Sequence, residues 1–505
     1  MTDGPGGSTA GASSAAARTA AGDPGDGEQG GGRSHTANAV LISVVAAIGG
    51  FLFGFDTAVI NGAVDALSGD FELSPGLTGF AVSSALLGCA TGAWFAGGAA
   101  DRFGRPKVMI IASVLFTASA IGSGLAFGVW DLILWRVVGG LGVGTASVIA
   151  PAYIAEIAPA AIRGRLGSLQ QLAIVTGIFV ALLSDAFLAG AAGGAAEELW
   201  LGLTAWRWMF LSELVPAVAY GLLALTIPES PRFLVARGED RRARTVLLRL
   251  MSGESARERI DAIKKSLQGQ KAVGLSNLRG AALGLQPIVW VGIALSLFQQ
   301  LVGINVIFYY STTLWRSVGF EESDALTVTV ITSVTNVAVT VVAILLVDRI
   351  GRRPLLLIGS TAMTAALATM AVCFSQATGS GEDVSLAEPW STVALVAANV
   401  FVVGFGVSWG PVVWVLLGEM FPNRLRAPAL AVAAAAQWVA NFAVSTTFPW
   451  LSENAGLAVT YGGYAAFALL SGLFVATVVQ ETKGRELEDM TGETGRRRKD
   501  LVGST

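Results

Sequence analysis

The sequence predicts an all-α membrane protein with about twelve transmembrane helices in two six-helix bundles. Hydrophobic residues make up 53% of the 505-residue chain and charged residues only 14%, whereas water-soluble domains carry about 25% charged residues. Apolar runs long enough to cross a bilayer also recur along almost the whole chain. In addition, one loop motif appears once in each half. Together these observations indicate a multi-pass membrane protein built by duplication.

Each apolar run is about as long as the roughly 20 residues that a transmembrane helix needs. The expected helices begin near Ala39, Leu77, Val108, Leu132, Gly167, Trp208, Pro287, Ala325, Leu355, Thr392, Ala427 and Tyr461.

The positions of Lys and Arg predict the orientation, because loops rich in these residues stay in the cytoplasm. Basic clusters follow every second expected span, from Arg102 after the second to Lys483 after the twelfth. The alternate loops are acidic, with Arg207 and Arg316 as the basic residues placed there. We therefore expect both termini in the cytoplasm.

Composition divides the chain into five parts. Residues 1–38 are rich in Gly, Ala, Ser and Asp without hydrophobic periodicity, which predicts a disordered cytoplasmic tail. The bundles are expected at 39–228 and 286–480. Between them the polar, charge-dense segment 229–285 predicts a cytoplasmic helical linker lying on the membrane surface. A C-terminal tail is expected at 481–505.

The cysteine and histidine residues narrow the chemistry of the interior. Cys89 and Cys373 lie in separate apolar spans, which favours buried thiols over a disulfide or a metal site. The one histidine, His35, lies in the N-terminal tail. A proton carrier within the membrane must therefore be a carboxylate or, as a weaker alternative, a tyrosine.

The loop motif indicates a tandem duplication. Asp101-Arg-Phe-Gly-Arg105 follows the second expected span and Asp348-Arg-Ile-Gly-Arg352 follows the eighth. Since each half has an even number of spans, the halves are parallel repeats about an axis along the membrane normal. Other matched features are Gly54-Phe55-Asp56 with Gly303-Ile304-Asn305, Glu156 before Arg163 with Glu419 before Arg426, and Glu229-Ser-Pro-Arg232 with Glu481-Thr-Lys-Gly-Arg485.

The simpler interpretation of this motif is a basic turn between two spans. Its recurrence in both halves favours a further function. Arginines near Glu156 and Glu419 are expected to form cytoplasmic ion pairs between helices that part when the protein opens inward. The residues assigned to these gating pairs are Asp101, Arg102, Arg105, Glu156, Arg163, Glu229, Arg232, Asp348, Arg349, Arg352, Glu419, Arg426 and Glu481.

Asp56 lies inside the first apolar run, where an ionisable group is costly and marks a functional site by default. Arg136 and Glu213 lie at similar depths, all about 9 to 14 Å below the outer surface at 1.5 Å per residue, so the three can meet. Two carboxylates and one guanidinium are expected to share a proton. The alternative is a permanent ion pair that steadies the N-terminal bundle.

Amide side chains recur in the spans and can both donate and accept hydrogen bonds, as a hydroxyl-rich solute requires. The alternative for each is that it only holds helices together. Trp414 and Trp438 add rings able to stack on a sugar. The amides are Gln171, Gln299, Gln300, Asn305, Asn336, Gln437 and Asn441.

These motifs resemble the sugar porters of the major facilitator superfamily, from about Val40 to Glu488. The ordered set, rather than any one motif, carries the resemblance. The motifs are Gly54-Phe-Asp-Thr-Ala-Val-Ile60, Gly139-Gly-Leu-Gly-Val-Gly144, Pro151-Ala-Tyr-Ile-Ala-Glu-Ile-Ala-Pro159, Pro228-Glu-Ser-Pro-Arg232, Gln299-Gln-Leu-Val-Gly-Ile-Asn305, Trp409-Gly-Pro-Val-Val-Trp414 and Glu419-Met-Phe-Pro422.

The resemblance implies the major facilitator fold, alternating access and a monosaccharide site between the bundles. An aspartate matching Asp56 is characteristic of proton symporters, whereas animal facilitative glucose transporters have asparagine there, and Arg136 and Glu213 complete the symporters' coupling cluster. In similar proteins the sugar is contacted by the positions matching Gln171, Gln299, Gln300, Asn305, Asn336, Trp414, Gln437 and Trp438, with Phe53 and Phe405 nearby.

Two positions depart from the family pattern. Gln480 replaces a proline that usually opens the C-terminal motif, with little effect expected beyond the helix end. Ile178 stands where the similar xylose symporter has a sugar-binding glutamine, and glucose-transporting relatives tend to be apolar there. This difference favours glucose over xylose as the substrate.

We therefore expect a monomeric proton-coupled symporter that imports D-glucose across the cytoplasmic membrane of a bacterium. The proton is the expected coupling ion, the lipid bilayer surrounds the protein, and neither another cofactor nor a nucleic-acid partner is expected. The alternatives are a D-xylose or galactose symporter, a facilitative uniporter in which Asp56 is structural, and a transporter-like sugar sensor. An enzyme is not expected, because the spans offer no nucleotide motif, no nucleophile beside a base and no histidine.

Overall fold

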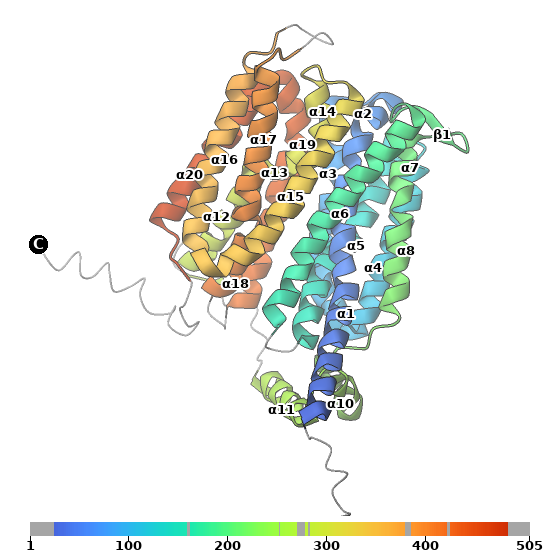
Figure 1. Ribbon diagram of the computed structural model, residues 1–505, viewed down its shortest axis with the longest axis vertical. Helices are drawn as coiled ribbons and strands as arrows, with labels where there is room; N and C mark the ends of the chain where they lie inside the picture. The colour runs from blue at the N-terminus through green and yellow to red at the C-terminus, as the bar shows by residue number, and fades with distance from the viewer. Residues whose placement is uncertain are drawn as a thin grey trace, which may run out of the picture.

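The computed structural model describes residues 25–158, 162–251, 253–269, 278–280, 283–378, 385–421 and 425–482. Within these ranges the chain is almost entirely helical, and Figure 1 shows two bundles side by side with the short helices α10 and α11 below them. The N-terminal bundle comprises α1 (Gly25–Ala58), α2 (Ile60–Asp70), α3 (Pro75–Phe103), α4 (Arg105–Gly124), α5 (Val129–Ile157), α6 (Arg163–Ala192), α7 (Ala205–Ser212) and α8 (Leu214–Ala224).

The second bundle follows the linker helices α9 (Pro231–Ala236), α10 (Asp240–Leu248) and α11 (Gly253–Gly269). A short hairpin of β1 (Glu198–Trp200) and β2 (Leu203–Thr204), which the sequence did not predict, lies at the other end of the molecule. The C-terminal bundle comprises α12 (Pro287–Leu301), α13 (Ile304–Tyr309), α14 (Ser311–Arg316), α15 (Glu322–Ile350), α16 (Arg352–Phe374), α17 (Trp390–Val407), α18 (Trp409–Met420), α19 (Arg426–Asn454) and α20 (Leu457–Thr477).

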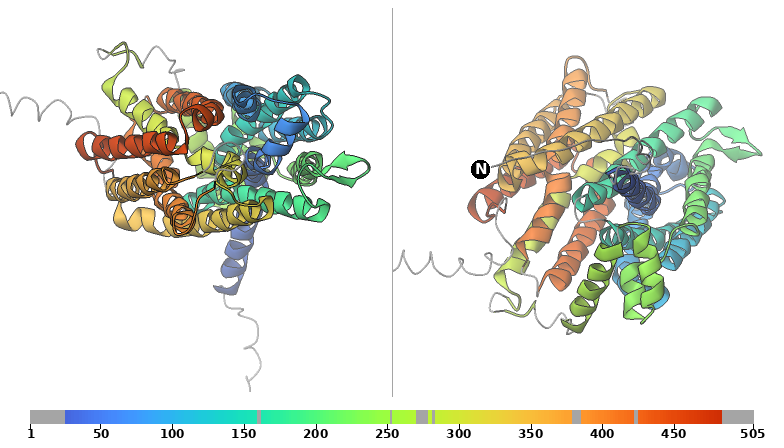
Figure 2. Two further views of the ribbon diagram at one scale, coloured as in Figure 1. Left: turned by 90° about the horizontal axis from the view of Figure 1, so that it is seen from above. Right: turned by 60° about the horizontal axis from the view of Figure 1, so that its bottom comes forward.

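We call the two ends of the molecule the linker end, which carries α9 to α11, and the hairpin end, which carries β1 and β2. Helix α1 begins at the linker end, and the last described residues, Glu481 and Thr482, bond to the linker-end start of α16 and to α18. Figure 2 shows the bundles from above and from the linker end. They meet where α3 packs on α19 and α6 packs on α15.

Eleven segments in the described part of the chain are long and apolar enough to cross a membrane. The sixth of the twelve predicted spans is divided into α7 and α8 at Glu213. Pro216 explains the division, because it has no N–H to donate to the carbonyl of Ser212. The expected multi-pass helical fold is therefore confirmed, with one span interrupted.

Further breaks separate α12 from α13 and α17 from α18. Gly303 has φ +79°, a left-handed conformation that glycine adopts without steric cost. Ser408 precedes Pro411, which cannot donate a hydrogen bond within the helix. Breaks of this kind leave polar backbone groups available inside a membrane protein where they line a site.

The N-terminal tail is more ordered than its composition predicts. Helix α1 begins at Gly25, so residues 25–38 of the predicted disordered tail are helical in the structure. A helix already formed by an apolar segment extends at one hydrogen bond per added residue, without a new nucleation step. Residues 1–24 and 483–505 lie outside the described residues.

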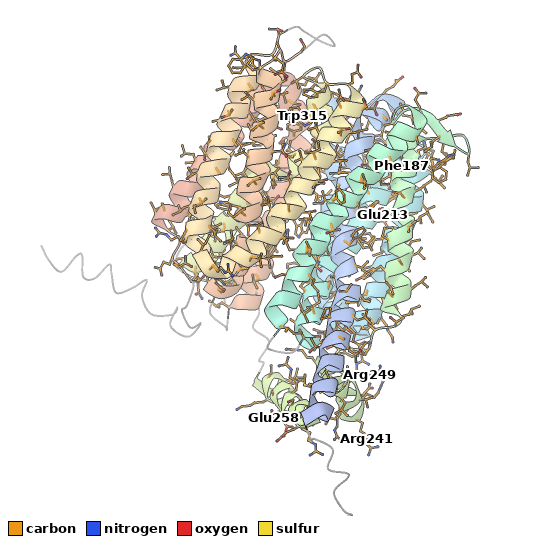
Figure 3. The ribbon with its side chains drawn as sticks, viewed as in Figure 1. Phe187, Glu213, Arg241, Arg249, Glu258 and Trp315 are labelled. Atoms are coloured by element: carbon orange, nitrogen blue, oxygen red, sulfur yellow. The ribbon has the colours of Figure 1, made fainter. Side chains whose placement is uncertain are left out.

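The linker helices have a small core of their own. Leu234, Val235, Ala243, Leu247 and Ile260 pack together in a cluster separate from the cores of the two bundles. The side chain of Asn38 on α1 donates to the carbonyl of Arg249 at 3.2 Å, which ties the linker to the start of the first span. Figure 3 shows Arg241, Arg249 and Glu258 on these helices at the linker end.

Candidate functional site: a buried charge cluster beside an amide-lined site

Asp56 and Arg136 meet inside the N-terminal bundle. Arg136 on α5 donates from Nη1 to the Asp56 carbonyl at 2.9 Å and to the Asp56 Oδ1 at 3.4 Å. Their side chains are 1% and 2% exposed, respectively, so the ion pair is closed off from solvent. Asp56 Oδ2 and Arg136 Nε have no hydrogen-bond partner in the described part of the chain.

Glu213 is the third member of this cluster and lies at the break between α7 and α8 (Figure 3). It is 1% exposed and close enough to interact electrostatically with both Asp56 and Arg136. The Arg136 guanidinium also lies over the Phe210 ring at 5.8 Å, one turn before Glu213. Because one guanidinium cannot neutralise two carboxylates, a proton on one carboxylate makes the cluster neutral.

Glycine in α5 makes room for the charge cluster. A Cβ atom at Gly139 would lie 2.4 Å from Ser119 Oγ and 3.1 Å from Asp56 Oδ1. Farther along α5, a Cβ at Gly140 or Gly144 would lie 1.9 or 2.0 Å from a backbone carbonyl of α3. The glycines of this motif therefore let one face of α5 pack closely on α3, and another face leaves room for the Asp56 carboxylate.

The amides of α12 and α13 form the second part of the site. Gln299 Nε2 donates to the carbonyls of Trp409 at 2.8 Å and Gly410 at 3.2 Å, at the break between α17 and α18. Gln300 Oε1 accepts from Asn305 Nδ2 at 2.6 Å. Gln299 Oε1 and Gln437 Oε1 are buried without a hydrogen-bond partner among the described residues. Two acceptors are therefore available for hydroxyl groups.

Aromatic residues link the two bundles at this level. Phe53 on α1 packs on Trp438 of α19, with ring centroids 5.8 Å apart and an interplanar angle of 46°. Phe53 lies three residues before Asp56, so the two residues are neighbours on successive turns of α1. The Phe405 ring lies against Gly410, where a Cβ would be 3.2 Å from it.

The other predicted sugar contacts are spread over the two bundles. Asn336 on α15 is buried, and Gln171 on α6 is half-buried. Trp414 on α18 is 41% exposed. Asn441 is buried, and its Oδ1 accepts from Ser445 Oγ at 3.1 Å.

Two further buried residues were missed by the sequence analysis. The Tyr309 hydroxyl is hydrogen-bonded to Asn441, and Tyr309 interacts electrostatically with Asp56 and Arg136. Asp185 on α6 is a further buried carboxylate. Its position in an apolar run is the same signal that identifies Asp56, whereas the position of Tyr309 depends on the helix break at Gly303.

The hairpin end is closed by hydrogen bonds between the bundles. Asn61 on α2 donates to the Phe308 carbonyl at 3.0 Å and accepts from the Thr312 hydroxyl at 2.6 Å. Asp65 accepts from Thr313 at 2.7 Å and pairs with Arg316 at 2.9 Å. The structure therefore represents a state in which the bundles are joined at the hairpin end.

The duplicated loop motif forms two equivalent networks at the linker end. Arg105 pairs with Glu156 at 3.0 Å, and its backbone N–H donates to Glu229 at 2.9 Å. Arg352 pairs with Glu419 at 2.7 Å, and its N–H donates to Glu481 at 3.0 Å. Each network joins helices of one bundle, so these particular bonds do not span the gap between bundles.

The remaining predicted gating residues vary in position. Asp101 pairs with Arg105 at 3.2 Å. The exposed Arg102 lies over the Phe103 ring, Arg232 is half-buried, and Arg349 is exposed. Burial raises the pKa of Glu229, although two backbone N–H groups and Arg105 counteract it. The side chains of Arg163, Asp348 and Arg426 lie outside the described residues.

The motif glycines explain why the networks can form. Gly104 and Gly351 have φ +94° and +103°, in the region that favours glycine. A Cβ at Gly104 would lie 2.0 Å from Glu229 Oε2, and a Cβ at Gly351 would lie 2.9 Å from Glu481 Oε2. In both halves, a glycine with positive φ therefore leaves room for a carboxylate that binds the backbone N–H of the next residue.

Comparison with known proteins places this arrangement in a family. The model of the family described as "Sugar (and other) transporter" matches residues 42–493. The chain belongs to this sugar transporter family. A glucose transport protein of Synechocystis sp. is 57% identical to this sugar transporter over 459 residues, which cover 90% of the chain and 98% of the relative.

Proton symporters also resemble this sugar transporter. The D-xylose-proton symporter of Escherichia coli is 39% identical over 483 residues, covering 89% of the chain and 94% of the relative. The partially occluded inward-open structure of the xylose transporter XylE from E. coli matches with a TM-score of 0.77 at 38% identity, covering 89% of this chain and 100% of that one. This sugar transporter is thus a multi-pass membrane protein of the major facilitator fold.

Proposed function

We propose that this sugar transporter is a proton-coupled symporter that imports a hexose, D-glucose, with Asp56 as the proton carrier. The observation that carries the proposal is the buried cluster in which Asp56 and Glu213 share the single guanidinium of Arg136. A buried charge without a partner is costly, so the cluster is most stable with one proton. Proton binding and the arrangement of the helices around Asp56 are then coupled.

Sugar recognition is assigned to the amide and aromatic side chains named above, with the free Oε1 atoms of Gln299 and Gln437 accepting from sugar hydroxyls. The Phe53 ring on Trp438 connects this site to α1, and Tyr309, which is hydrogen-bonded to Asn441, interacts electrostatically with Asp56 and Arg136. Sugar bound to the C-terminal bundle therefore affects the position of α1, which carries Asp56. The apolar Ile178 and the glucose transport protein among the relatives support glucose as the substrate.

The transport cycle follows from these assignments. Sugar binds from the hairpin end, which we place outside the cell, while the cluster holds a proton. The bundles then close at the hairpin end, as in the structure, and open at the linker end, which we place in the cytoplasm with both termini. Asp56 releases its proton there, and the networks of Arg105 and Arg352 rearrange within each bundle as the helices move.

Uptake by proteoliposomes tests the coupling. With an inward proton gradient, the native protein accumulates labelled glucose, whereas Asp56→Asn only equilibrates it and still exchanges sugar across the membrane. Asp131→Asn, which alters a carboxylate at the start of α5, is the matched control and retains accumulation. Accumulation by Asp56→Asn, or no proton movement with sugar in the native protein, would contradict proton coupling.

Competition of labelled glucose uptake by unlabelled glucose, xylose, galactose and arabinose tests the substrate. Glucose is expected to compete most strongly, because Ile178 removes an amide from the site that a pentose symporter uses. Stronger competition by xylose than by glucose would overturn the glucose assignment without affecting the proton assignment.

A further inference from the structure

Asp185 is a second carboxylate sealed inside the N-terminal bundle. It lies on α6 and is 0% exposed. Its Oδ2 accepts from the Gly62 N–H at 3.3 Å, and its Oδ1 has no hydrogen-bond partner in the described part of the chain. An ionised carboxylate in such a place lacks the cation or donors that would offset its lost hydration. The closed structure therefore favours the protonated, neutral acid.

Charged groups on the neighbouring helices are engaged elsewhere or exposed. Asp56 pairs with Arg136, Asp65 with Arg316, and Asp70 with Arg207, while Glu322 accepts from the Ala195 N–H at 2.9 Å. Glu213 at the end of α7 is buried and belongs to the coupling cluster. Asp131 is half-buried, Glu156 lies at the linker end, and the exposed carboxylates of these elements are Glu197, Glu198, Glu321 and Asp324. Among the described residues, none of these side chains bonds to Asp185.

The partner of Asp185 belongs to the segment that closes the hairpin end. Gly62 directly follows Asn61, whose side chain holds Phe308 and Thr312 of the other bundle. The approach is close: a Cβ at Gly62 would lie 2.6 Å from the Asp185 Cβ and 2.9 Å from its Oδ2. The carboxyl group thus binds the backbone of α2 at the residue next to the inter-bundle contact.

A cavity at the hairpin end reaches the same place. It has a volume of about 410 Å³ and is lined by Gly62, Asp65, Thr312 and Arg316, among others. Gly62 therefore faces this cavity and also donates to Asp185. When the bundles separate here, the contacts of Asn61 and Asp65 break and water reaches this level of α2.

We propose that Asp185 takes up a proton from the hairpin-end solution when the bundles close at that end, so that low pH on that side favours closure. Separation hydrates the carboxyl group and allows it to ionise, and closure removes that hydration. The proton returns to the same side when the end reopens. Asp185 is therefore a proton-sensitive latch, distinct from the coupling cluster, and its proton is not transported.

Distance measurements between spin labels at the hairpin end test this proposal without sugar or flux. Labels at Glu198→Cys and Ser323→Cys report separation of the bundles, in a background with Cys89→Ala and Cys373→Ala. Asp56→Asn and Glu213→Gln are included so that neither carboxylate of the coupling cluster contributes. In this background, the ratio of closed to open molecules is expected to rise as pH falls from 8 to 5, by up to about tenfold per unit for one linked proton.

Asp185→Asn keeps the shape and an acceptor for the Gly62 N–H but cannot titrate, so its ratio is expected to be constant with pH. Asp185→Ala must give the same flat response, which separates titration from an effect of the new amide. With Asp56 and Glu213 restored, Asp185→Asn retains proton-driven accumulation of sugar. An unchanged pH response in both variants, or loss of accumulation in Asp185→Asn, would overturn the latch, and neither result depends on which sugar is carried.

Discussion

Tyr309 of α13 is hydrogen-bonded through its hydroxyl to Asn441 of α19 and interacts electrostatically with Asp56 and Arg136 of the other bundle. This tyrosine is 6% exposed, so its hydroxyl has little water to bond with in place of Asn441. The relationship connects an amide assigned to sugar binding with the charge cluster assigned to proton binding.

Tyr309→Phe is expected to weaken sugar binding with little effect on the maximal rate. The variant removes one hydrogen bond of about 0.5 to 1.5 kcal/mol, which corresponds to a roughly 2- to 13-fold higher KM for uptake. Tyr464→Phe is the matched control, because the hydroxyl of Tyr464 has no hydrogen-bond partner in the described residues. Equal kinetics in both variants would show that the Tyr309 hydroxyl has no part in binding.

Gln437→Leu is expected to reduce sugar affinity about tenfold, because a buried acceptor that meets a hydroxyl is lost and the hydroxyl is left unpaired. Calorimetric titration with glucose measures the affinity. Gln376→Leu, an exposed amide after α16, should bind as the native protein does. Titration with a series of monodeoxyglucoses is a sharper test. The sugar that lacks the hydroxyl bound by Gln437 should bind the native protein and Gln437→Leu equally. If no sugar of the series binds both proteins equally, Gln437 does not contact a hydroxyl.

Gly139→Ala is expected to abolish transport, because its methyl group would lie 2.4 Å from Ser119 Oγ and 3.1 Å from Asp56 Oδ1. Overpacking of this kind costs about 1 to 3 kcal/mol, which exceeds the gain of roughly 1 kcal/mol from replacing a helical glycine. Gly97→Ala on α3, where no atom lies within 4 Å, should be neutral or stabilising. Thermal unfolding and uptake of both variants, measured in parallel, compare these effects; native-like uptake by Gly139→Ala would contradict the packing argument.

Gly104→Ala is expected to destabilise the protein more than Gly456→Ala does. The two glycines share one backbone conformation, with φ +94° and ψ 162° at Gly104 and φ +82° and ψ 157° at Gly456, so alanine incurs a similar backbone strain of about 1 to 3 kcal/mol at each. At Gly104 the methyl group would also lie 2.0 Å from Glu229 Oε2, whereas at Gly456 nothing lies within 4 Å. The difference in melting temperature between the variants isolates the carboxylate contact, and equal melting temperatures would show that the contact contributes nothing.

Much of the architecture could be predicted because bilayer thickness limits how a chain of this composition can fold. Span lengths and the depths of Asp56, Arg136 and Glu213 follow from residue spacing along helices of known rise, and the duplication follows from the repeated loop motif. The division of the sixth span at Glu213 was not predicted, although Pro216 is visible in the sequence, because its neighbours are strongly apolar. The helical residues 25–38 were missed because composition does not reveal extension from a neighbouring helix.

By itself, the sequence determined which residue types are buried in the membrane and at what depth, since helix rise converts position into distance. Only the tertiary structure decided which of them touch: that Gly139 leaves space for the Asp56 carboxylate, that Tyr309 faces Asn441, and that Asp185 meets Gly62 beside the inter-bundle contact. Those pairings depend on the rotation of each helix and on breaks such as that at Gly303. Rotation and breaks are set by side-chain packing between segments far apart in the chain.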